Sequence, residues 1–180
     1  RSLMPAPRLA DRLREGEVLY CGWSGLSDPL APEALARAGF DAVCLDYQHG
    51  HLDFAALRSG ITAIAGAGAA PLVRAPIGGF ADIGKALDQG AEAIICPMIN
   101  SRADAEHLAR AVKFPPVGER SWAPHRVTML WEMEPADFFG RANEAIVAQA
   151  MIETKAALDN LDDILAVDGI DGVFVGPNDL

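Results

Sequence analysis

The chain has 180 residues, 51% of them hydrophobic, and its 15 basic and 25 acidic residues give a formal net charge of −10. This length suits one substantial domain, which we place over residues 1–180. An acidic chain without basic clusters is not expected to bind nucleic acid or an anionic membrane. No stretch reaches the roughly 18 apolar residues of a membrane helix. The N-terminus is too charged for a signal peptide, so we expect a cytoplasmic protein.

Apolar, strand-like runs alternate with helical patterns along the chain. Strands are predicted at 18–25, 40–47, 70–76, 91–99, 145–153 and 172–177, with a short seventh near 118–122. Helices are predicted at 32–39, 54–68, 80–90, 155–167 and from the capping box Ser101-x-x-Asp104 onward. The Pro-rich segment 115–142 is predicted to be irregular. Three cysteines, Cys21, Cys44 and Cys96, fall in predicted strands and are expected to be buried free thiols.

Repeated strand–helix units with apolar strands predict a parallel sheet covered by helices. Two architectures fit, a doubly wound open sheet and a (β/α)8 TIM barrel. No glycine-rich dinucleotide fingerprint follows the first strand, which favours the barrel. A barrel needs a further strand–helix unit just beyond Leu180. We therefore expect a single α/β domain whose barrel is C-terminally truncated.

Polar side chains collect where the predicted strands end. In a (β/α)8 barrel the catalytic groups follow the C-terminal ends of the strands. These positions hold, in chain order, Asp46, His49, Arg74, Glu153 and Asp179. Each alone has a structural explanation, such as a helix cap, a loop histidine bonded to a carbonyl, or an ion pair. Their joint occurrence favours a functional site, because burying charge without a function is costly.

These residue types suit one kind of chemistry. Two carboxylates on separate strands, Glu153 and Asp179, form a hard oxygen site for Mg²⁺ or Mn²⁺, and a bound 2-oxo acid would complete the coordination. Arg74 would place positive charge beside the substrate carboxylate or an enolate oxygen. His49, oriented by Asp46, would act as a base. Together they predict enolisation next to a carbonyl, the first half of an aldol reaction.

Five stretches carry a family resemblance. They are "LDYQHG" (45–50), "PLVRAP" (71–76), "ALDQGAEAIICPMINS" (86–101), "FPPVGERS" (114–121) and "MIETKAALDNLDDILAVDGIDGVFVGPNDL" (151–180). In this order they resemble the HpcH/HpaI aldolase family of metal-dependent pyruvate aldolases. The resemblance implies cleavage of a 4-hydroxy-2-oxo or 2-keto-3-deoxy acid to pyruvate and an aldehyde through a metal-stabilised enolate. It also implies a (β/α)8 barrel, assembled as a homo-oligomer, in the family a hexamer of swapped dimers.

The same resemblance assigns roles to individual residues. Glu153 and Asp179 match the family's metal ligands, for Mg²⁺ or Mn²⁺ with Co²⁺ as a further candidate. His49 with Asp46 matches its catalytic dyad, and Arg74 its pyruvate-binding arginine. The backbone of Gly176 and Pro177 would lie against the pyruvate carboxylate. The eighth strand and the swapped helix would follow Leu180.

Two positions depart from the family pattern. Gln48 stands where a glutamate is common, and an amide there can hydrogen-bond a water but cannot act as a base. Met151 stands where many members have glutamine, which removes a polar contact near the metal or substrate. Both residues are expected to tune substrate choice without abolishing the carboxylate pair.

Three other functions remain as alternatives. A Schiff-base aldolase would need a lysine projecting into the barrel, and the candidates are Lys85, Lys113 and Lys155. A CoA-ester lyase of the citrate-lyase-β or malyl-CoA type shares the barrel and the metal carboxylates, but its usual arginines for CoA phosphates contrast with this acidic chain. A catalytically inactive barrel that serves as an assembly module is the third.

Overall fold

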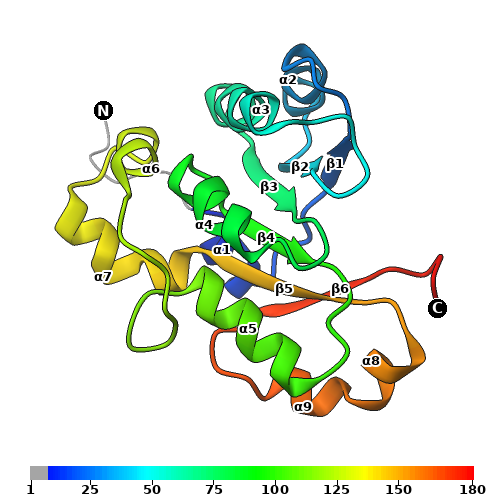
Figure 1. The fold of residues 1–180 in the computed structure, drawn as a ribbon. Coiled ribbons are helices and arrows are strands. Elements are labelled where there is room, and N and C mark those ends of the chain that lie inside the picture. Colours follow the sequence, from blue (N-terminus) through cyan, green and yellow to red (C-terminus); the bar gives the residue numbers. More distant parts are fainter. Residues whose placement is uncertain (1–7) are drawn as a thin grey trace.

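The computed structural model describes residues 8–180 and shows a curled, six-stranded parallel sheet with helices outside it (Figure 1). The strands pair in chain order, from first to last. They are β1 (Cys21–Ser24), β2 (Ala42–Asp46), β3 (Ala70–Arg74), β4 (Ala93–Cys96), β5 (Val147–Ile152) and β6 (Gly172–Val175). The α/β class and the six principal predicted strands are thereby confirmed.

At least one helix follows each of β1 to β5, as the predicted strand–helix units require, and α1 precedes β1. Their bounds are α1 (Leu9–Arg14), α2 (Leu30–Arg37), α3 (Phe54–Gly66), α4 (Phe80–Asp88), α5 (Arg102–Val112), α6 (His125–Leu130), α7 (Pro135–Ala145), α8 (Lys155–Asp159) and α9 (Leu161–Leu165). The Ser101 side chain caps α5 by accepting a hydrogen bond from the Asp104 backbone N at 3.2 Å. The capping box therefore begins α5 where the sequence predicted it.

Successive side chains of a strand point to opposite faces of the sheet, and this alternation divides the core into two clusters. One set of side chains, which includes Val43, Leu45 and Ile94, faces the helices and forms the larger cluster. The opposite set faces the inside of the curled sheet, where Cys44, Leu72, Ile95, Met151 and Phe174 pack with α1. The inner face is where a curled parallel sheet presents functional side chains. Asp46, Arg74 and Glu153 share its strand parity.

The short strand predicted near 118–122 is wrong. Backbone N–H groups in this segment bond to the end of α5 and the residues after it instead of to a strand: Glu119 N donates to Arg110 O at 2.9 Å and Arg120 N to Lys113 O at 3.0 Å. The Arg120 side chain is held by Asp88 at 2.7 Å. These contacts place the segment over α4 and α5 and engage the N–H groups of Glu119 and Arg120, which are then not available to a strand ladder.

Two further differences concern helices. The helix predicted over 155–167 is broken at Asn160, whose side chain donates to Asn100 O at 2.8 Å. The segment 115–142, predicted to be irregular, contains α6 and most of α7. Pro135 begins α7 at its first turn, where the missing N–H is not needed.

The cysteines are all free thiols in the described chain, as predicted, but only two are buried. Cys44 and Cys96 lie in central strands, and burial raises the pKa of Cys96 to about 12. Cys21 is exposed because β1 is an edge of the sheet. Burial of its sulfur still raises the pKa of Cys21 to about 11.

We expect Ellman's reagent to modify one thiol per native chain, slowly at pH 8, since a pKa of about 11 leaves little thiolate. Two more should react at once in denaturant. Cys21→Ser should abolish the native reaction and leave two thiols in denaturant. Rapid native modification of two or three thiols would contradict the burial of Cys44 and Cys96.

No helix within residues 8–180 is long and apolar enough to span a membrane. Of the charged N-terminal stretch over residues 1–17, residues 1–7 lie outside the described residues, and the remainder contains α1.

Candidate active site

Asp46 and Arg74 form the polar centre at the C-terminal ends of β2 and β3. The two residues are register partners across the sheet. Arg74 grips the carboxylate with two bonds, Nε to Oδ1 at 3.0 Å and Nη2 to Oδ2 at 2.5 Å. The indole Nε1 of Trp23 donates to the same Oδ2 at 3.2 Å, and the guanidinium lies 5.0 Å from the Trp23 ring. This is a bidentate, planar clamp of the kind that only arginine makes.

The loop after β2 adds two more donors to Asp46. The backbone N of Gln48 donates to Oδ1 at 3.2 Å and that of His49 at 3.0 Å. Burial raises the pKa of Asp46, but the hydrogen bonds from Arg74, the His49 backbone and Trp23 outweigh it, and the net pKa is lowered. Asp46 is therefore ionised at neutral pH.

These five donors occupy a carboxylate with about four lone-pair sites. Asp46 thus contacts His49 through its backbone, and within residues 8–180 no hydrogen bond joins the carboxylate to the imidazole. The His49 side chain is exposed at the mouth of the sheet. The catalytic dyad stays a prediction, whereas the ion pair between Asp46 and Arg74 is present.

Glu153 lies just beyond the C-terminal end of β5 and is only 4% exposed. Its Oε1 accepts a hydrogen bond from the Met98 backbone N at 2.7 Å. Among the described residues no arginine, lysine or histidine pairs with this carboxylate. A buried carboxylate without a cationic partner is costly, and a divalent cation is a partner that would fit its oxygen donors.

Gly176 follows β6 and lies against Glu153. A Cβ at this glycine would lie 2.6 Å from Met151 Cε, 3.1 Å from Glu153 Cβ and 3.5 Å from Glu153 Oε2. The backbone of β6 therefore approaches the carboxylate as closely as its packing allows. The Met151 side chain, 4% exposed, packs beneath the site with the inner apolar cluster.

We expect Gly176→Ala to lower the free energy of unfolding by about 1 kcal/mol, through overpacking against Met151 and Glu153. In a Met151→Ala background, Gly176→Ala should no longer lower the free energy of unfolding, because its closest contact, with Met151 Cε, is gone. Gly140→Ala on α7 is the control: its Cβ would meet nothing within 4 Å, so the helix should gain about 0.5–1 kcal/mol. Equal effects of the two alanines in urea denaturation would refute the close approach at Gly176.

The remaining predicted residues lie at the same end of the sheet but are more exposed or make fewer hydrogen bonds. Pro177 and Asp179 are exposed in the segment after β6. The Gln48 Oε1 is buried and has no hydrogen-bond partner in the described part of the chain. Residues 8–180 contain no cluster of three or more His, Cys, Asp or Glu side chains placed to hold a metal. A metal site here would depend on two carboxylates, as the sequence predicted.

The lysines are placed badly for Schiff-base chemistry. Lys85 and Lys155 are on helices with side chains 61% and 83% exposed, and each pairs with an aspartate on its own helix. Lys113 is buried beside Asp171, at the N-terminal end of β6 and so at the far end of the sheet. None of the three lysines within residues 8–180 projects from a strand into the candidate site, so none of them is placed to act as a Schiff-base nucleophile there.

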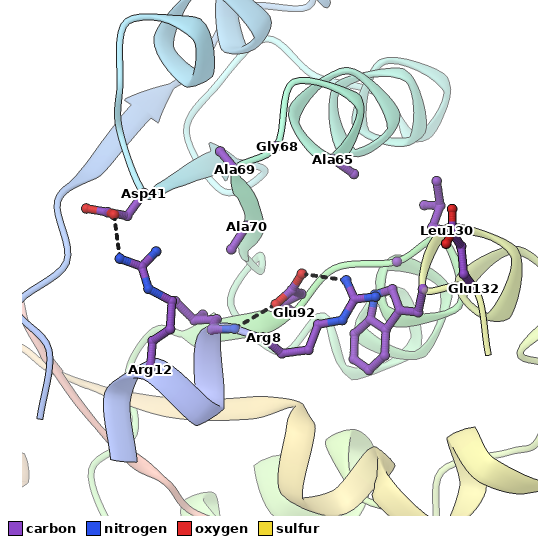
Figure 2. Close-up of a pocket in the computed structure, with 13 residues that line it drawn as sticks. Arg8, Arg12, Asp41, Ala65, Gly68, Ala69, Ala70, Glu92, Leu130 and Glu132 are labelled. Atoms are coloured by element: carbon purple, nitrogen blue, oxygen red, sulfur yellow. Dashed lines mark hydrogen bonds and ion pairs between the residues drawn. The ribbon is translucent and has the colours of Figure 1, made fainter. Parts of the chain in front are cut away.

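A separate cavity of about 280 Å³ lies at the N-terminal ends of β2–β4 (Figure 2). Its arginines are already paired: Arg8 Nη1 with Glu92 Oε1 at 3.2 Å, and Arg12 Nη2 with Asp41 Oδ1 at 2.7 Å. Arg8 also lies 4.5 Å from the Trp131 ring. The two ion pairs connect α1 and its N-cap residue Arg8 to the N-terminal ends of β2 and β4. In barrel folds this end serves stability, so the cavity is not the candidate active site.

A family model described as HpcH/HpaI aldolase/citrate lyase matches residues 20–180. The chain belongs to this family. A hydroxypyruvate/pyruvate aldolase of Rhizorhabdus wittichii is 46% identical over 166 residues, which are 92% of this chain and 65% of that protein. A 5-keto-4-deoxy-D-glucarate aldolase of Escherichia coli is 36% identical, covering 88% and 61%.

Solved structures of the HpcH/HpaI family share the fold described above. The crystal structure of an HpcH/HpaI aldolase from Desulfitobacterium hafniense superposes with a TM-score of 0.89 at 31% identity, over 97% of this chain and 68% of that one. The present chain thus spans about two thirds of the length of the relatives it matches.

Three residues of the candidate site, Trp23, Met98 and Asn100, were not predicted from the sequence. Trp23 lies inside a predicted strand, and its position two residues before the strand end was the available signal. Met98 and Asn100 follow β4, whose C-terminal end carries no charged residue that would mark it as part of a site. Their contribution is through the backbone and an amide, which a search for ionisable groups overlooks.

Proposed function

We propose that the protein is a metal-dependent aldolase that interconverts a 4-hydroxy-2-oxo or 2-keto-3-deoxy acid with pyruvate and an aldehyde. One observation supports it most. Arg74, which is ion-paired with Asp46, and Glu153, a buried carboxylate without a cationic side-chain partner in the described residues, lie at the same end of the inner face of the sheet. The names of the relatives, hydroxypyruvate/pyruvate aldolase and 5-keto-4-deoxy-D-glucarate aldolase, point to the same reaction class.

Arg74 would bind the substrate carboxylate and stabilise developing negative charge. Its Nε and one N–H of Nη2 hold Asp46, which leaves the other guanidinium N–H groups for the substrate. Because Asp46 and Trp23 fix the guanidinium in advance, little reorganisation accompanies charge development. His49, exposed at the mouth, would move the proton between the substrate's third carbon or its hydroxyl and solvent.

Glu153 and Asp179 would hold the divalent cation, Mg²⁺ or Mn²⁺ with Co²⁺ as a further candidate. The hard oxygen donors and the absence of an engaged thiol suit these ions. When bound, the cation would supply Lewis-acid charge beside the 2-oxo group. Gly176 and Pro177 would line the carboxylate end of the substrate, with Gln48 and Met151 bordering it.

The closed (β/α)8 barrel and the homo-oligomer are part of this proposal. The parallel strand order, the helices outside the sheet and the apolar inner face all support a barrel. The cytoplasmic location stays a prediction.

The direct test incubates the protein with pyruvate, Mg²⁺ or Mn²⁺ and a panel of short aldehydes, including hydroxylated ones, and detects products by mass spectrometry. We expect pyruvate-plus-aldehyde adducts that require the metal and disappear with EDTA. Cleavage of malyl-CoA or citryl-CoA, without aldol adducts, would replace the proposal with the CoA-ester lyase, which the family description also covers. If neither kind of product is detected, the inactive barrel is the remaining alternative.

A further inference from the structure

We infer that Asn100 is a positioning residue for the proposed metal-binding carboxylate of Glu153, acting through the backbone of Met98. This inference rests on the proposed function. The chain of contacts runs from the Asn100 amide to the Met98 carbonyl, and from the Met98 N–H to Glu153 Oε1. No charged group takes part in it apart from Glu153 itself.

Met98 holds an unusual backbone conformation. Its φ is +58°, a left-handed value that residues other than glycine rarely adopt. This turn directs the Met98 N–H toward Glu153, 2.7 Å from Oε1. The Met98 side chain is 38% exposed, so apolar packing does little to hold the turn. A strained residue of this kind persists when its surroundings over-determine it, and such residues cluster at functional sites.

Asn100 supplies the surroundings that hold the turn. Its side-chain Nδ2 donates to Met98 O at 3.3 Å, while its Oδ1 accepts a hydrogen bond from Thr154 Oγ1. Its backbone N donates to Asp104 Oδ2 at 3.1 Å, and its backbone O accepts from Asn160 Nδ2 at 2.8 Å. Every polar group of Asn100 is therefore engaged, and the amide is fixed in one orientation.

The bond to Thr154 joins the two halves of the site. Thr154 is the residue immediately after Glu153, and it caps α8 by accepting from Ala157 N at 3.0 Å. Asn100 thus ties the loop after β4 to the end of β5, on both sides of the Glu153 carboxylate. With Oε1 held by Met98, Oε2 stays directed toward Gly176, where a cation would bind. Groups that orient a metal ligand in this way affect metal affinity strongly.

The test measures Mn²⁺ alone, by the loss of its free EPR signal on titration with the purified protein, next to urea denaturation of each variant. We expect Asn100→Ala to raise the Kd for Mn²⁺ by about 10-fold. Thr154→Val should raise it in the same direction, while Thr154→Ser, which keeps the hydroxyl, should match the wild type. Arg102→Ala is the control, since within residues 8–180 the ion pair of Arg102 is with Glu106 on the exposed face of α5.

The outcomes separate this inference from the proposed function. Loss of Mn²⁺ binding in Glu153→Ala together with an unchanged Kd in Asn100→Ala and Thr154→Val would overturn the role of Asn100 alone. A wild type that binds no Mn²⁺, or a Glu153→Ala variant that binds it normally, would overturn both. A purely structural role would lower the urea midpoint of these variants without moving the Kd. Should Asn100→Ala fail to fold, the Thr154→Val and Thr154→Ser pair decides the question.

Discussion

Arg74→Lys is expected to lower kcat/KM for pyruvate release from the best aldol substrate by about 10²–10³-fold, the loss that follows removal of one preorganised donor to developing charge. Arg74 holds Asp46 with two bonds from one planar group. A lysine ammonium is a point charge that cannot reproduce this clamp and also serve the substrate. The charge is conserved in the variant, so the loss reports geometry.

Arg102→Lys is the matched control for Arg74→Lys, because Arg102 makes one exposed ion pair on α5 and should leave kcat/KM within twofold of the wild type. Urea denaturation of both variants separates lost function from lost stability. If Arg74→Lys retains kcat/KM within twofold, the pair of Arg74 and Asp46 is an architectural ion pair and not part of the active site.

Lys113→Met is expected to lower the free energy of unfolding by about 3 kcal/mol, because buried acceptors that lose a charged donor cost about 1–3 kcal/mol each. The Lys113 side chain is 1% exposed, and its Nζ donates to Asn143 O at 2.7 Å, Ile146 O at 2.6 Å and Asp171 Oδ2 at 2.7 Å. Burial lowers its pKa, and the Asp171 hydrogen bond opposes that effect. Methionine fills a similar volume but leaves the Asn143 and Ile146 carbonyls without their lysine donor, while Asp171 Oδ2 keeps only the Ala148 N–H at 2.7 Å.

Lys155→Met provides the comparison. Lys155 is 83% exposed and pairs with Asp159 one helical turn away, so its loss should change stability by less than about 0.5 kcal/mol. Asp171→Asn added to Lys113→Met should recover part of the deficit, since the uncompensated charge is gone. A destabilisation by Lys113→Met as small as that of Lys155→Met would show that Lys113 does not tie α5 and α7 to β6.

The apolar runs predicted the six strands, most plainly β2 and β4, because strands buried on both faces read as continuous hydrophobic segments. The helices α6 and α7 were harder to predict, because the prolines of the segment after α5 favour an irregular structure. Pro135, in the first turn of α7, was a signal for that helix. Lys113 could not be placed from the sequence, because lysine is rarely buried and its three acceptors come from distant positions.

For the site, strand ends were sufficient to nominate Asp46, Arg74 and Glu153, but not their partners. The register of β2 against β3 sets Asp46 opposite Arg74, and a single sequence does not reveal the register of parallel strands. The proximity of His49 to Asp46 in the chain suggested a pairing of their side chains, which stays a prediction; the contact that the structure shows is the His49 backbone N with Asp46 Oδ1. The left-handed backbone conformation at Met98 could not be predicted, because the position is not occupied by glycine, the residue that usually indicates it.

The most direct test of the account follows the methyl protons of pyruvate by NMR in D₂O, with the protein and with or without Mg²⁺ or Mn²⁺. It needs no knowledge of the aldehyde, because it observes only the proton transfer that precedes carbon–carbon bond formation. We expect metal-dependent loss of the methyl signal by exchange, abolished in His49→Ala and in Glu153→Ala. No exchange, or exchange that needs no metal and persists in both variants, would contradict it.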